Sequence, residues 1–276
     1  MHPKETAQNN AIGLIAGQGD FPVLFTEAAM SLGKKVIVFG VEGCTDPRLA
    51  NLASEMHWVG LGELEKLAGL LRAKNIRQAA LAGGIPKKEM YNPSFSMDSA
   101  ASGLIQGVKN KGDDHLLRAF QLYLKVKCGV SILDSRKFLK NTMAAKGVLT
   151  ARAPSREEWE DLRFGWRIAK GIGKMDIGQT VVVKQGVVLA VEAIEGTDNA
   201  VKRGASLGQG EAVVVKVCKP GQDLRFDLPC VGRQTLENLK SGSCRVLGVE
   251  AGKTIMIFKE KLIEMANREH MTIVGL

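Results

Sequence analysis

Three short runs in the second half of the chain place acidic side chains beside glycine, proline or amide residues. The runs are MDIGQ at 175–179, IEGTD at 194–198 and KPGQDLRFDLP at 219–229. Their acids are Asp176, Glu195, Asp198, Asp223 and Asp227, and the basic Lys219 and Arg225 stand among them. Carboxylate oxygens suit Mg²⁺ or Mn²⁺, which neutralise phosphate oxygens while basic side chains hold the rest of an anion. Together the runs favour a metal-assisted reaction on a phosphate-bearing substrate.

A structural interpretation of these acids is also open, since carboxylates cap helices and brace turns. This structural interpretation suits any one acid taken alone. It suits the three runs together less well, because a helix cap does not need acidic, amide and basic residues next to one another. No G-x-S-x-G elbow is present, and no Cys or His has a neighbour that marks a nucleophile. Hydrolysis by an activated water therefore fits the side chains better than a covalent route.

The stretch GLIAGQGDFP at 13–22 has the outline of a dinucleotide-binding turn, with Gly17 and Gly19 after an apolar run. Pro22 replaces the third glycine, and Glu42 lies near the distance expected of the acid that binds the ribose. Asp20, inside the loop, opposes a bound phosphate unless a cation intervenes. A dinucleotide, a different ligand and a purely structural turn are three open interpretations.

Most of the net charge of +9 lies between Lys109 and Arg152, where ten Lys and Arg residues accompany three acids. Such a window suits phosphate-bearing small molecules, an anionic membrane surface or nucleic acid, and it can also be a solvated face without a ligand. Its aromatic residues are only Phe120, Tyr123 and Phe138, and it has no nucleic-acid-binding motif. Base stacking has little support, so we expect no nucleic-acid partner.

The composition excludes several classes of protein. A hydrophobic fraction of 45% and a charged fraction of 24% are typical of soluble globular proteins, and no stretch approaches the roughly 20 apolar residues that span a bilayer. The polar N-terminus lacks the apolar centre of a secretory signal, so we expect a cytoplasmic protein. Five Cys without CxxC spacing and four scattered His predict buried, inert thiols and neither a disulfide framework nor a zinc site.

The first half alternates short apolar runs with helix-periodic segments, which is the pattern of βαβ units around a parallel sheet. Strands are predicted at 12–16, 36–39 and 78–83, and helices at 21–32 and 62–73. A further helix is predicted in GDDHLLRAFQLYLKVK at 112–127, with Asp113 or Asp114 as its N-cap.

Weak periodicity, Gly147 and Pro154 mark a domain boundary in the segment 141–155, so we predict one domain at residues 1–145 and another at 146–276. Ser155 and Glu158 are expected to form a capping box. The runs TVVVKQGVVLAVE at 180–192 and VLGVEAGKTIMIF at 246–258 are both predicted as hairpins. The second domain is therefore expected to be α/β with a mixed sheet, unlike the first.

Several pieces of the sequence, taken in order, carry a family resemblance. They are GLIAGQGDFP at 13–22, AGG at 82–84, KGDDHLLRA at 111–119, MDIGQTVVV at 175–183, GVVLAVEAIEGTD at 186–198, KPGQDLRFDLP at 219–229 and EAGKTI at 250–255. Each is weak alone, but together they span nearly the whole chain, which resembles the LpxI type of UDP-2,3-diacylglucosamine diphosphatase. The resemblance implies a Rossmann-like N-terminal domain with a parallel sheet and a separate C-terminal domain that hold a diacyl sugar phosphate between them.

The activity that the resemblance implies is hydrolysis of UDP-2,3-diacylglucosamine to UMP and 2,3-diacylglucosamine 1-phosphate, known as lipid X, with Mg²⁺ or Mn²⁺ in lipid A synthesis. Carried over residue by residue, Asp227 is the expected metal ligand or water activator, and Asp223 is a further metal ligand. Implied substrate contacts in the first domain are Asp20, Ala82, Gly83, Gly112 and Asp113. Those in the second domain are Asp176, Gln179, Thr197, Asp198, Lys219 and Arg225.

Two departures from the family pattern leave every carboxylate in place: GQGDFP where GGGxLP is commoner, and DLPCVG where DLPTIG is usual. The acyl chains imply peripheral contact with the inner membrane, for which the window Lys109–Arg152 is the expected docking face, and the resemblance also suggests a homodimer. Two other functions stay open. One is a nucleotide-dependent oxidoreductase built on the glycine loop, and the other is a lipid or nucleotide carrier without turnover.

Overall fold

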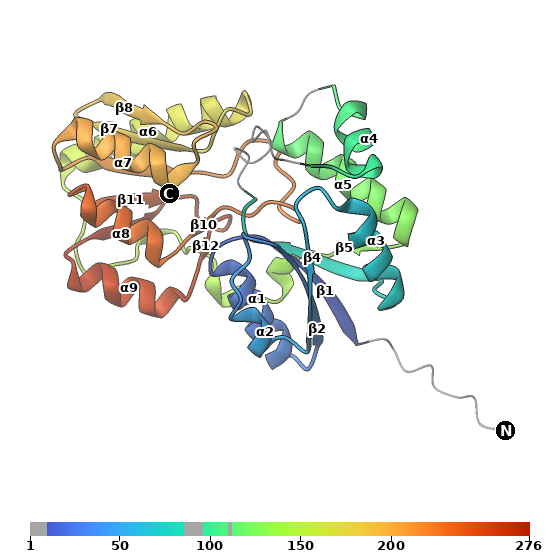
Figure 1. The fold of residues 1–276 in the computed structure, drawn as a ribbon. Helices are drawn as coiled ribbons and strands as arrows, with labels where there is room; N and C mark the ends of the chain where they lie inside the picture. Colours follow the sequence, from blue (N-terminus) through green and yellow to red (C-terminus); the bar gives the residue numbers. More distant parts are fainter. Residues whose placement is uncertain (1–9, 86–95, 110–111) are drawn as a thin grey trace. The chain divides into compact units, whose positions relative to one another are not determined.

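The computed structural model describes residues 10–85, 96–109 and 112–276, and the chain divides into two compact units (Figure 1). The first unit contains the described residues up to Leu139, and the second includes Lys140–Leu276. Each unit is an α/β domain with its own main sheet, parallel in the first and mixed in the second, so the predicted fold class is confirmed. Among the described residues, no helix is both long and apolar enough to cross a membrane.

Five parallel strands form the sheet of the first unit, in the order β3-β2-β1-β4-β5. They are β1 (Ala11–Ala16), β2 (Lys35–Val41), β3 (Glu55–Val59), β4 (Gln78–Ala82) and β5 (Ser131–Ile132). The order reverses between β1 and β4, and α/β sheets bind ligands outside the carboxyl ends of strands at such a switch point. The glycine loop follows β1 at this point.

The helices of the first unit form two groups, which Figure 1 draws on opposite sides of its sheet. Helix α1 (Phe21–Ser31) packs on α2 (Leu49–Leu52). Helices α3 (Leu64–Ala73), α4 (Ser99–Gly107) and α5 (Asp113–Cys128) pack on one another. Right-handed crossovers explain this arrangement, since the connections run one way from β1 to β3 and the other way after it.

The start of α5 differs from the sequence-based expectation. Its N-cap is Gly112, which has extended backbone and no capping side-chain hydrogen bond, so the assignment of Asp113 or Asp114 as N-cap is wrong. Glycine is accepted at an N-cap, and an acid in the first turn is favoured by the helix dipole without capping. The helix ends at Gly129, whose φ of 68° is a left-handed conformation that glycine adopts readily.

Six strands form the main sheet of the second unit, in the order β6-β13-β11-β9-β7-β8. Its parallel centre is β9 (Val213–Lys216), β11 (Val246–Val249) and β13 (Thr272–Gly275). Antiparallel strands flank it: β7 (Thr180–Lys184) and β8 (Val187–Val191) on one edge, and β6 (Gly147–Val148) on the other. The short strands β10 (Cys230–Val231) and β12 (Ile255–Met256) pair separately.

Strands β7 and β8 confirm the first predicted hairpin. Its two turn residues, Gln185 and Gly186, have φ values of 51° and 74°, which suits the left-handed turn that the twist of a hairpin favours. The buried carboxylate of Asp161 accepts hydrogen bonds from both turn N–H groups, at 2.8 and 2.7 Å. The turn is thus fixed by a side chain from outside the hairpin.

The second predicted hairpin, at 246–258, is wrong. Strand β11 pairs in parallel with β9 and β13, and β12 pairs in parallel with β10. The reason is that β11 already has a neighbour on each side, so no position remains for an antiparallel partner. Glu250, directly after β11, instead turns the chain out of the sheet by accepting hydrogen bonds at its carbonyl from the N–H groups of Lys253 and Thr254.

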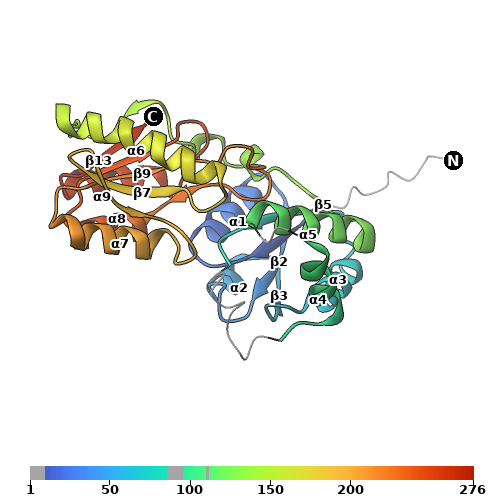
Figure 2. The ribbon, with the colours of Figure 1, turned by 90° about the horizontal axis from the view of Figure 1, so that it is seen from above.

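Figure 2 shows α6 (Arg156–Lys174) on one side of this sheet and α7 (Thr197–Gly208) and α8 (Arg233–Ser241) on the other. Leu162 and Ala169 of α6 pack on alternate valines of β7 and β9, and Ala205 and Leu239 pack on the opposite face. The remaining helix, α9 (Lys259–Arg268), contributes Leu262 and Ala266 to that second core. At the start of α6, Ser155 and Glu158 form the predicted capping box.

Two glycine-rich loops meet at the switch point of the first sheet. The N–H of Gly17 donates to Ala82 O at 2.8 Å, and that of Gln18 donates to Gly84 O at 2.9 Å. A Cβ atom on Gly17 would lie 2.4 Å from Gly84 O, and one on Gly83, whose φ is 86°, would lie 2.6 Å from Gln18 O. Close backbone contact between the loops therefore requires glycine at both positions.

We expect Gly17→Ala to lower the free energy of unfolding by about 2–4 kcal/mol, because its methyl group meets backbone atoms that cannot move alone. The matched control is Gly69→Ala within α3, where an added Cβ meets nothing within 4 Å. That substitution should raise stability by up to about 1 kcal/mol. Urea unfolding of both variants checks this, and equal effects would contradict the close-contact explanation.

Candidate active site

Four loops gather at one edge of the six-stranded sheet. Strands β9 and β11 end there, and antiparallel β7 begins there beside the end of β8. Hydrogen bonds join the loops: Val217 N to Gln179 O at 2.9 Å, Glu192 N to Thr180 O at 2.8 Å, and Cys218 N to Glu250 Oε2 at 2.8 Å. The three acid-rich runs and the loop after β11 therefore lie at the same edge.

Asp176 and Lys219 form a largely buried ion pair across two of these loops. Lys219 Nζ donates to Asp176 Oδ1 at 2.7 Å, and only 5% of the lysine side chain is exposed. Asp176 has a φ of 56°, and its Oδ2 atom is buried without a partner in the described part of the chain. The pair links the loop before β7 to the loop after β9.

Asp227 is held by Gln222, a residue that the sequence did not single out. Gln222 Nε2 donates to Asp227 Oδ2. At its other end, Gln222 Oε1 accepts from Lys219 N at 2.9 Å. Because one amide spans the loop, the orientation of the Asp227 carboxylate is fixed by the loop itself.

Asp223 and Arg225 form a charge pair within the same loop. The guanidinium donates from Nη2 to Asp223 Oδ2 at 2.6 Å and from Nε to Asp223 Oδ1 at 3.0 Å, and it lies over the ring of Phe226 at 4.9 Å. This pair occupies lone pairs that a metal ion at Asp223 needs, and the metal role of Asp223 stays a prediction.

Thr197 and Asp198 begin α7, beside Gln179. Thr197 Oγ1 donates to Glu192 Oε1 at 2.8 Å, and Asp198 Oδ1 accepts from Asn238 Nδ2 at 2.7 Å. The backbone N–H of Gln179 donates to Glu192 Oε2 at 3.3 Å, while Gln179 Oε1 is buried without a partner among the described residues. One sheet edge thus brings together four residues on loops and one at a helix start: Asp176, Gln179, Lys219 and Asp227, with Thr197 of α7.

Three buried charged residues at this edge were missed by the sequence analysis, namely Lys216, Glu192 and Glu250. Lys216 ends β9 and Glu192 follows β8, and they are only 9% and 8% exposed. The signal was available in the runs VVVKVC and LAVEA, where a single charge interrupts an apolar strand. Such a charge is rarely buried unless it is paired or functional.

In the first unit, Asp20, Ala82 and Gly83 lie at the carboxyl ends of β1 and β4. Asp20 Oδ1 lies 3.0 Å from Nη2 of the exposed Arg48, another residue that the sequence analysis missed. The N–H groups of Gly17 and Gln18 are bonded to the neighbouring loop and cannot serve a dinucleotide phosphate as a glycine-rich cradle does. Gly112 lies at the start of α5, and the side chain of Asp113 is outside the described structure.

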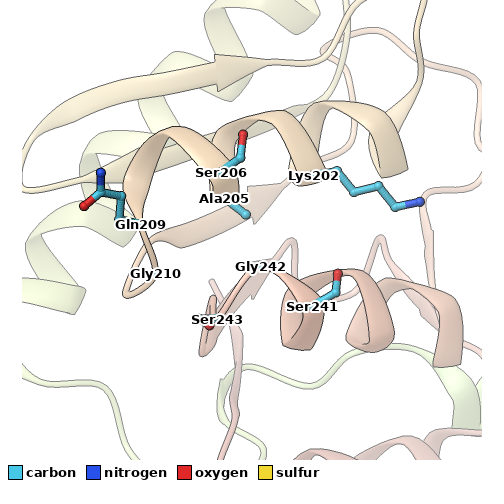
Figure 3. A pocket seen from close by; sticks show the side chains of 8 residues that line it. All are labelled: Lys202, Ala205, Ser206, Gln209, Gly210, Ser241, Gly242 and Ser243. Atoms are coloured by element: carbon cyan, nitrogen blue, oxygen red, sulfur yellow. The ribbon is translucent and has the colours of Figure 1, made fainter.

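A hollow of about 350 Å³ lies between the ends of α7 and α8 (Figure 3). Its lining residues include Lys202, Ser206, Gln209 and Ser241. None of the predicted site residues lines it, because the acid-rich loops adjoin the opposite end of α7. This hollow is therefore separate from the candidate site.

Comparison with known proteins covers both units. The LpxI N-terminal domain matches residues 11–142, and the LpxI C-terminal domain matches residues 145–274. UDP-2,3-diacylglucosamine pyrophosphatase LpxI of Caulobacter vibrioides is 32% identical over 96% of this chain and 97% of its own length. The chain belongs to the LpxI family. The resemblance inferred from the motifs is thereby confirmed.

Solved structures add little to the LpxI assignment. A nucleoside-diphosphate-sugar epimerase from Pseudomonas aeruginosa has a TM-score of 0.30 at 9% identity, covering 96% of this chain and 88% of its own. The biotin carboxylase domain of the Hydrogenobacter thermophilus 2-oxoglutarate carboxylase has a TM-score of 0.25 at 15% identity, with 71% of this chain and 41% of that chain covered. Scores this low carry no argument about function.

The donor set at this LpxI site suits one kind of metal binding. Within the described residues, no group of three or more His, Cys, Asp or Glu side chains could hold an ion. Mg²⁺ does not require such a cage, since one or two carboxylates, waters and the phosphates of a substrate often complete its shell. Asp227, with its position fixed by Gln222, fits a site in which one or two carboxylates bind the ion together with waters and substrate phosphates.

Three of the five cysteines, Cys128, Cys218 and Cys244, are buried, whereas Cys44 and Cys230 are only partly buried, so the prediction of buried thiols is wrong for these two. Burial raises the pKa of Cys218 and of Cys244 to about 11 and that of Cys230 to about 12. A thiol needs its thiolate form to act as a nucleophile. The expectation that Cys218, Cys230 and Cys244 are inert is supported, and no covalent cysteine route is suggested by them.

We expect the free energy of unfolding to fall as the pH rises from about 9 to 11. The unfolded chain releases its thiol protons near the ordinary pKa of about 8.5, whereas the folded chain retains them, so this stability is complete below that pH and is lost through the folded pKa. Urea unfolding at several pH values measures the slope. Cys244→Ala should make this loss of stability smaller by about 1.4 kcal/mol for each unit by which burial raised that thiol's pKa. An unchanged pH dependence contradicts the assignment.

Proposed function

We propose that this chain hydrolyses the diphosphate of UDP-2,3-diacylglucosamine, giving UMP and 2,3-diacylglucosamine 1-phosphate with the aid of a divalent metal ion. The oxygen of water forms a new bond to phosphorus, the bridging P–O bond breaks, and the departing phosphate takes the electron pair. The proposal is carried by one observation. In a member of the LpxI family, the loop with Asp227 lies beside the loops with Asp176 and Thr197 at one sheet edge.

Asp227 is the proposed centre of the reaction. Its carboxylate, positioned by Gln222, would hold Mg²⁺ or Mn²⁺ together with the substrate phosphates. When bound, such an ion neutralises phosphate oxygens and lowers the pKa of a bound water. Asp223, through the same loop, is proposed as a further ligand.

The remaining predicted residues are proposed to bind the substrate. Lys219 and Arg225 supply positive charge near the diphosphate, although both already have an acidic partner. Gln179 and Asp176 offer buried acceptor atoms to sugar or uracil donors, and Thr197 and Asp198 begin the adjacent helix. Asp20, Ala82, Gly83, Gly112 and Asp113 are proposed as contacts from the first unit.

We further propose peripheral contact with the inner membrane, which the acyl chains of the substrate require. Helix α5 supports this, because Leu122 and Val126 are 64% and 71% exposed beside the exposed Arg118, Lys125 and Lys127. A helix that presents apolar and basic side chains together suits the interface of an anionic membrane. Homodimerisation stays a prediction.

We expect Asp227→Asn to lower kcat by roughly 10²- to 10⁴-fold, as loss of a group acting directly on water or metal does, with no loss of stability. The matched control is Asp161→Asn, since Asp161 is equally a carboxylate but binds the β7–β8 turn. That variant should lose about 1–3 kcal/mol of stability and keep its kcat. The rate at which the purified protein releases UMP from UDP-2,3-diacylglucosamine measures the first effect, and urea unfolding measures the second.

The metal requirement is tested in the same assay with Mg²⁺, Mn²⁺ or EDTA. Activity that EDTA removes and either ion restores supports the proposal. Activity that persists in EDTA contradicts the proposed metal requirement but leaves the proposed hydrolysis reaction standing. A folded wild type that releases no UMP with any metal refutes the hydrolysis, and binding of NADH under those conditions would favour an oxidoreductase.

Lys125→Gln with Lys127→Gln should weaken binding to phosphatidylglycerol vesicles by roughly 30-fold, at about 1 kcal/mol for each basic residue near an anionic surface. Lys174→Gln with Lys261→Gln removes the same charge from exposed positions of the second unit and is the control. Vesicle co-sedimentation at constant ionic strength compares the pairs. Equal weakening in both pairs would show an effect of net charge without a specific docking face.

A further inference from the structure

Lys216 is a buried lysine that has no ion-pair partner in the part of the chain that the structure describes. Its side chain, at the end of β9, is 9% exposed, and its ammonium makes one hydrogen bond, to Thr197 Oγ1 at 3.3 Å. Within the described residues, no carboxylate forms an ion pair with it. Removing an ammonium from water costs free energy that only an opposite charge or several hydrogen bonds offset, so the fold alone does not explain Lys216.

The position of Lys216 is also unfavourable for stability. Thr180 lies opposite it in the sheet, and Lys216 alternates onto the face of Val214, where α7 packs. Its ammonium meets the first residue of α7, and the N-terminus of a helix carries a partial positive charge that repels a cation. Lys184 shows the favourable arrangement, since its ammonium donates to Gly208 O at 2.8 Å and Gly210 O at 3.1 Å at the other end of the same helix.

The start of α7 has no side-chain cap. Its N-cap is Gly196, with a φ of 81°, and no side chain of residues 10–85, 96–109 or 112–276 accepts from the first N–H groups. The two nearby acids do not cap the helix, because Asp198 binds Asn238, and Glu192 binds the backbone of Gln179 and the Thr197 hydroxyl that also accepts from Lys216. The helix end and Lys216 therefore present donors and positive charge at one place, the combination that binds phosphate at helix N-termini.

The same edge also has acceptors without donors. Gln179 Oε1 and Asp176 Oδ2 are buried and make no hydrogen bond in the described part of the chain. Gln179 lies close to Lys216 along the sheet edge, since the carbonyl of Gln179 accepts from the N–H of Val217, the residue after Lys216. A buried cation without an anion, next to a buried acceptor without a donor, matches a phosphorylated molecule that also carries hydroxyl or N–H groups.

We propose that Lys216 Nζ and the first backbone N–H groups of α7 bind a phosphoryl group of the substrate. This inference rests on the proposed function and adds to it the residue that holds one phosphate. Asp227 lies within reach of the same place, because Lys216 and Asp227 both act electrostatically on the thiol of Cys230, with opposite signs. The loop after β9 thus provides a carboxylate, and the end of β9 an ammonium, within electrostatic range of the same thiol.

The test uses Lys216→Met, which keeps the length of the side chain and removes its charge, and Lys184→Met as the matched control. The probes are inorganic phosphate, UMP and glucosamine 1-phosphate, so the free ion, the nucleotide half and the sugar half are told apart. Titrations of ¹⁵N-labelled protein follow the amide signals of Thr197 and Asp198. For the probe that binds, Lys216→Met should weaken binding roughly 10- to 100-fold, and Lys184→Met should leave it within twofold.

Stability separates binding from a structural role. A functional Lys216 predicts that Lys216→Met is at least as stable as wild type in urea, since an unpaired buried charge is removed, whereas Lys184→Met loses stability with its helix-end bonds. A destabilised Lys216→Met with unchanged affinity would overturn the proposal. The proposal would also be overturned if the α7 amide signals of wild type responded to none of the probes. This second test does not depend on the folding of a variant.

The hydrolysis assay is read independently. If wild type releases UMP and Lys216→Met keeps its kcat/KM, the inference is wrong and the proposed function stands. If wild type releases none but phosphate shifts the α7 amides in a Lys216-dependent manner, the phosphoryl site stands and the proposed function is wrong.

Discussion

The buried carboxylate of Glu250 is the interaction on which the candidate site depends. It accepts from Lys170 of α6 at 2.5 Å, from Lys253 at 3.0 Å and from the backbone N–H of Cys218 at 2.8 Å. Burial acts to raise the pKa of Glu250, but hydrogen bonds from these partners hold it below its usual value. One anion thus joins a helix, the exit of β11 and the start of the loop that carries Asp227. Gln222 can fix the position of the Asp227 carboxylate only because Glu250 anchors the start of the same loop.

The glycine loop of the first unit shows how a nucleotide-binding appearance can arise from backbone packing. At the switch point of a parallel sheet, the loops after β1 and β4 leave side by side. Gly17 and Gly83 let their backbones touch and exchange hydrogen bonds. The same residue types that admit a pyrophosphate therefore admit a second loop, and spacing alone does not distinguish the two uses.

Local patterns predicted the elements that are long or carry their own stop signals. The capping box at Ser155, the β7–β8 hairpin and the parallel strands around β1 all contain their information within a few residues. The failures concern non-local choices: β11 found parallel partners far away in sequence, and the two-residue strands β5, β6, β10 and β12 are too short for any period. In the site, acids beside glycine were recognisable. Lys216 was not, because its importance follows from what stands across the sheet and at the end of α7.

The place of β13 in the sheet has a consequence for synthesis of the protein. This strand, Thr272–Gly275, lies between β11 and β6, so an inner strand of the sheet is translated after both of its neighbours. Before it is translated, β11 has a bare edge, and β6 has no partner in the main sheet. Since domains fold from the N-terminus as they are synthesised, the first unit can complete its sheet early, whereas the second cannot do so until β13 has been translated. In that interval the bare edge of β11 can pair wrongly with another strand.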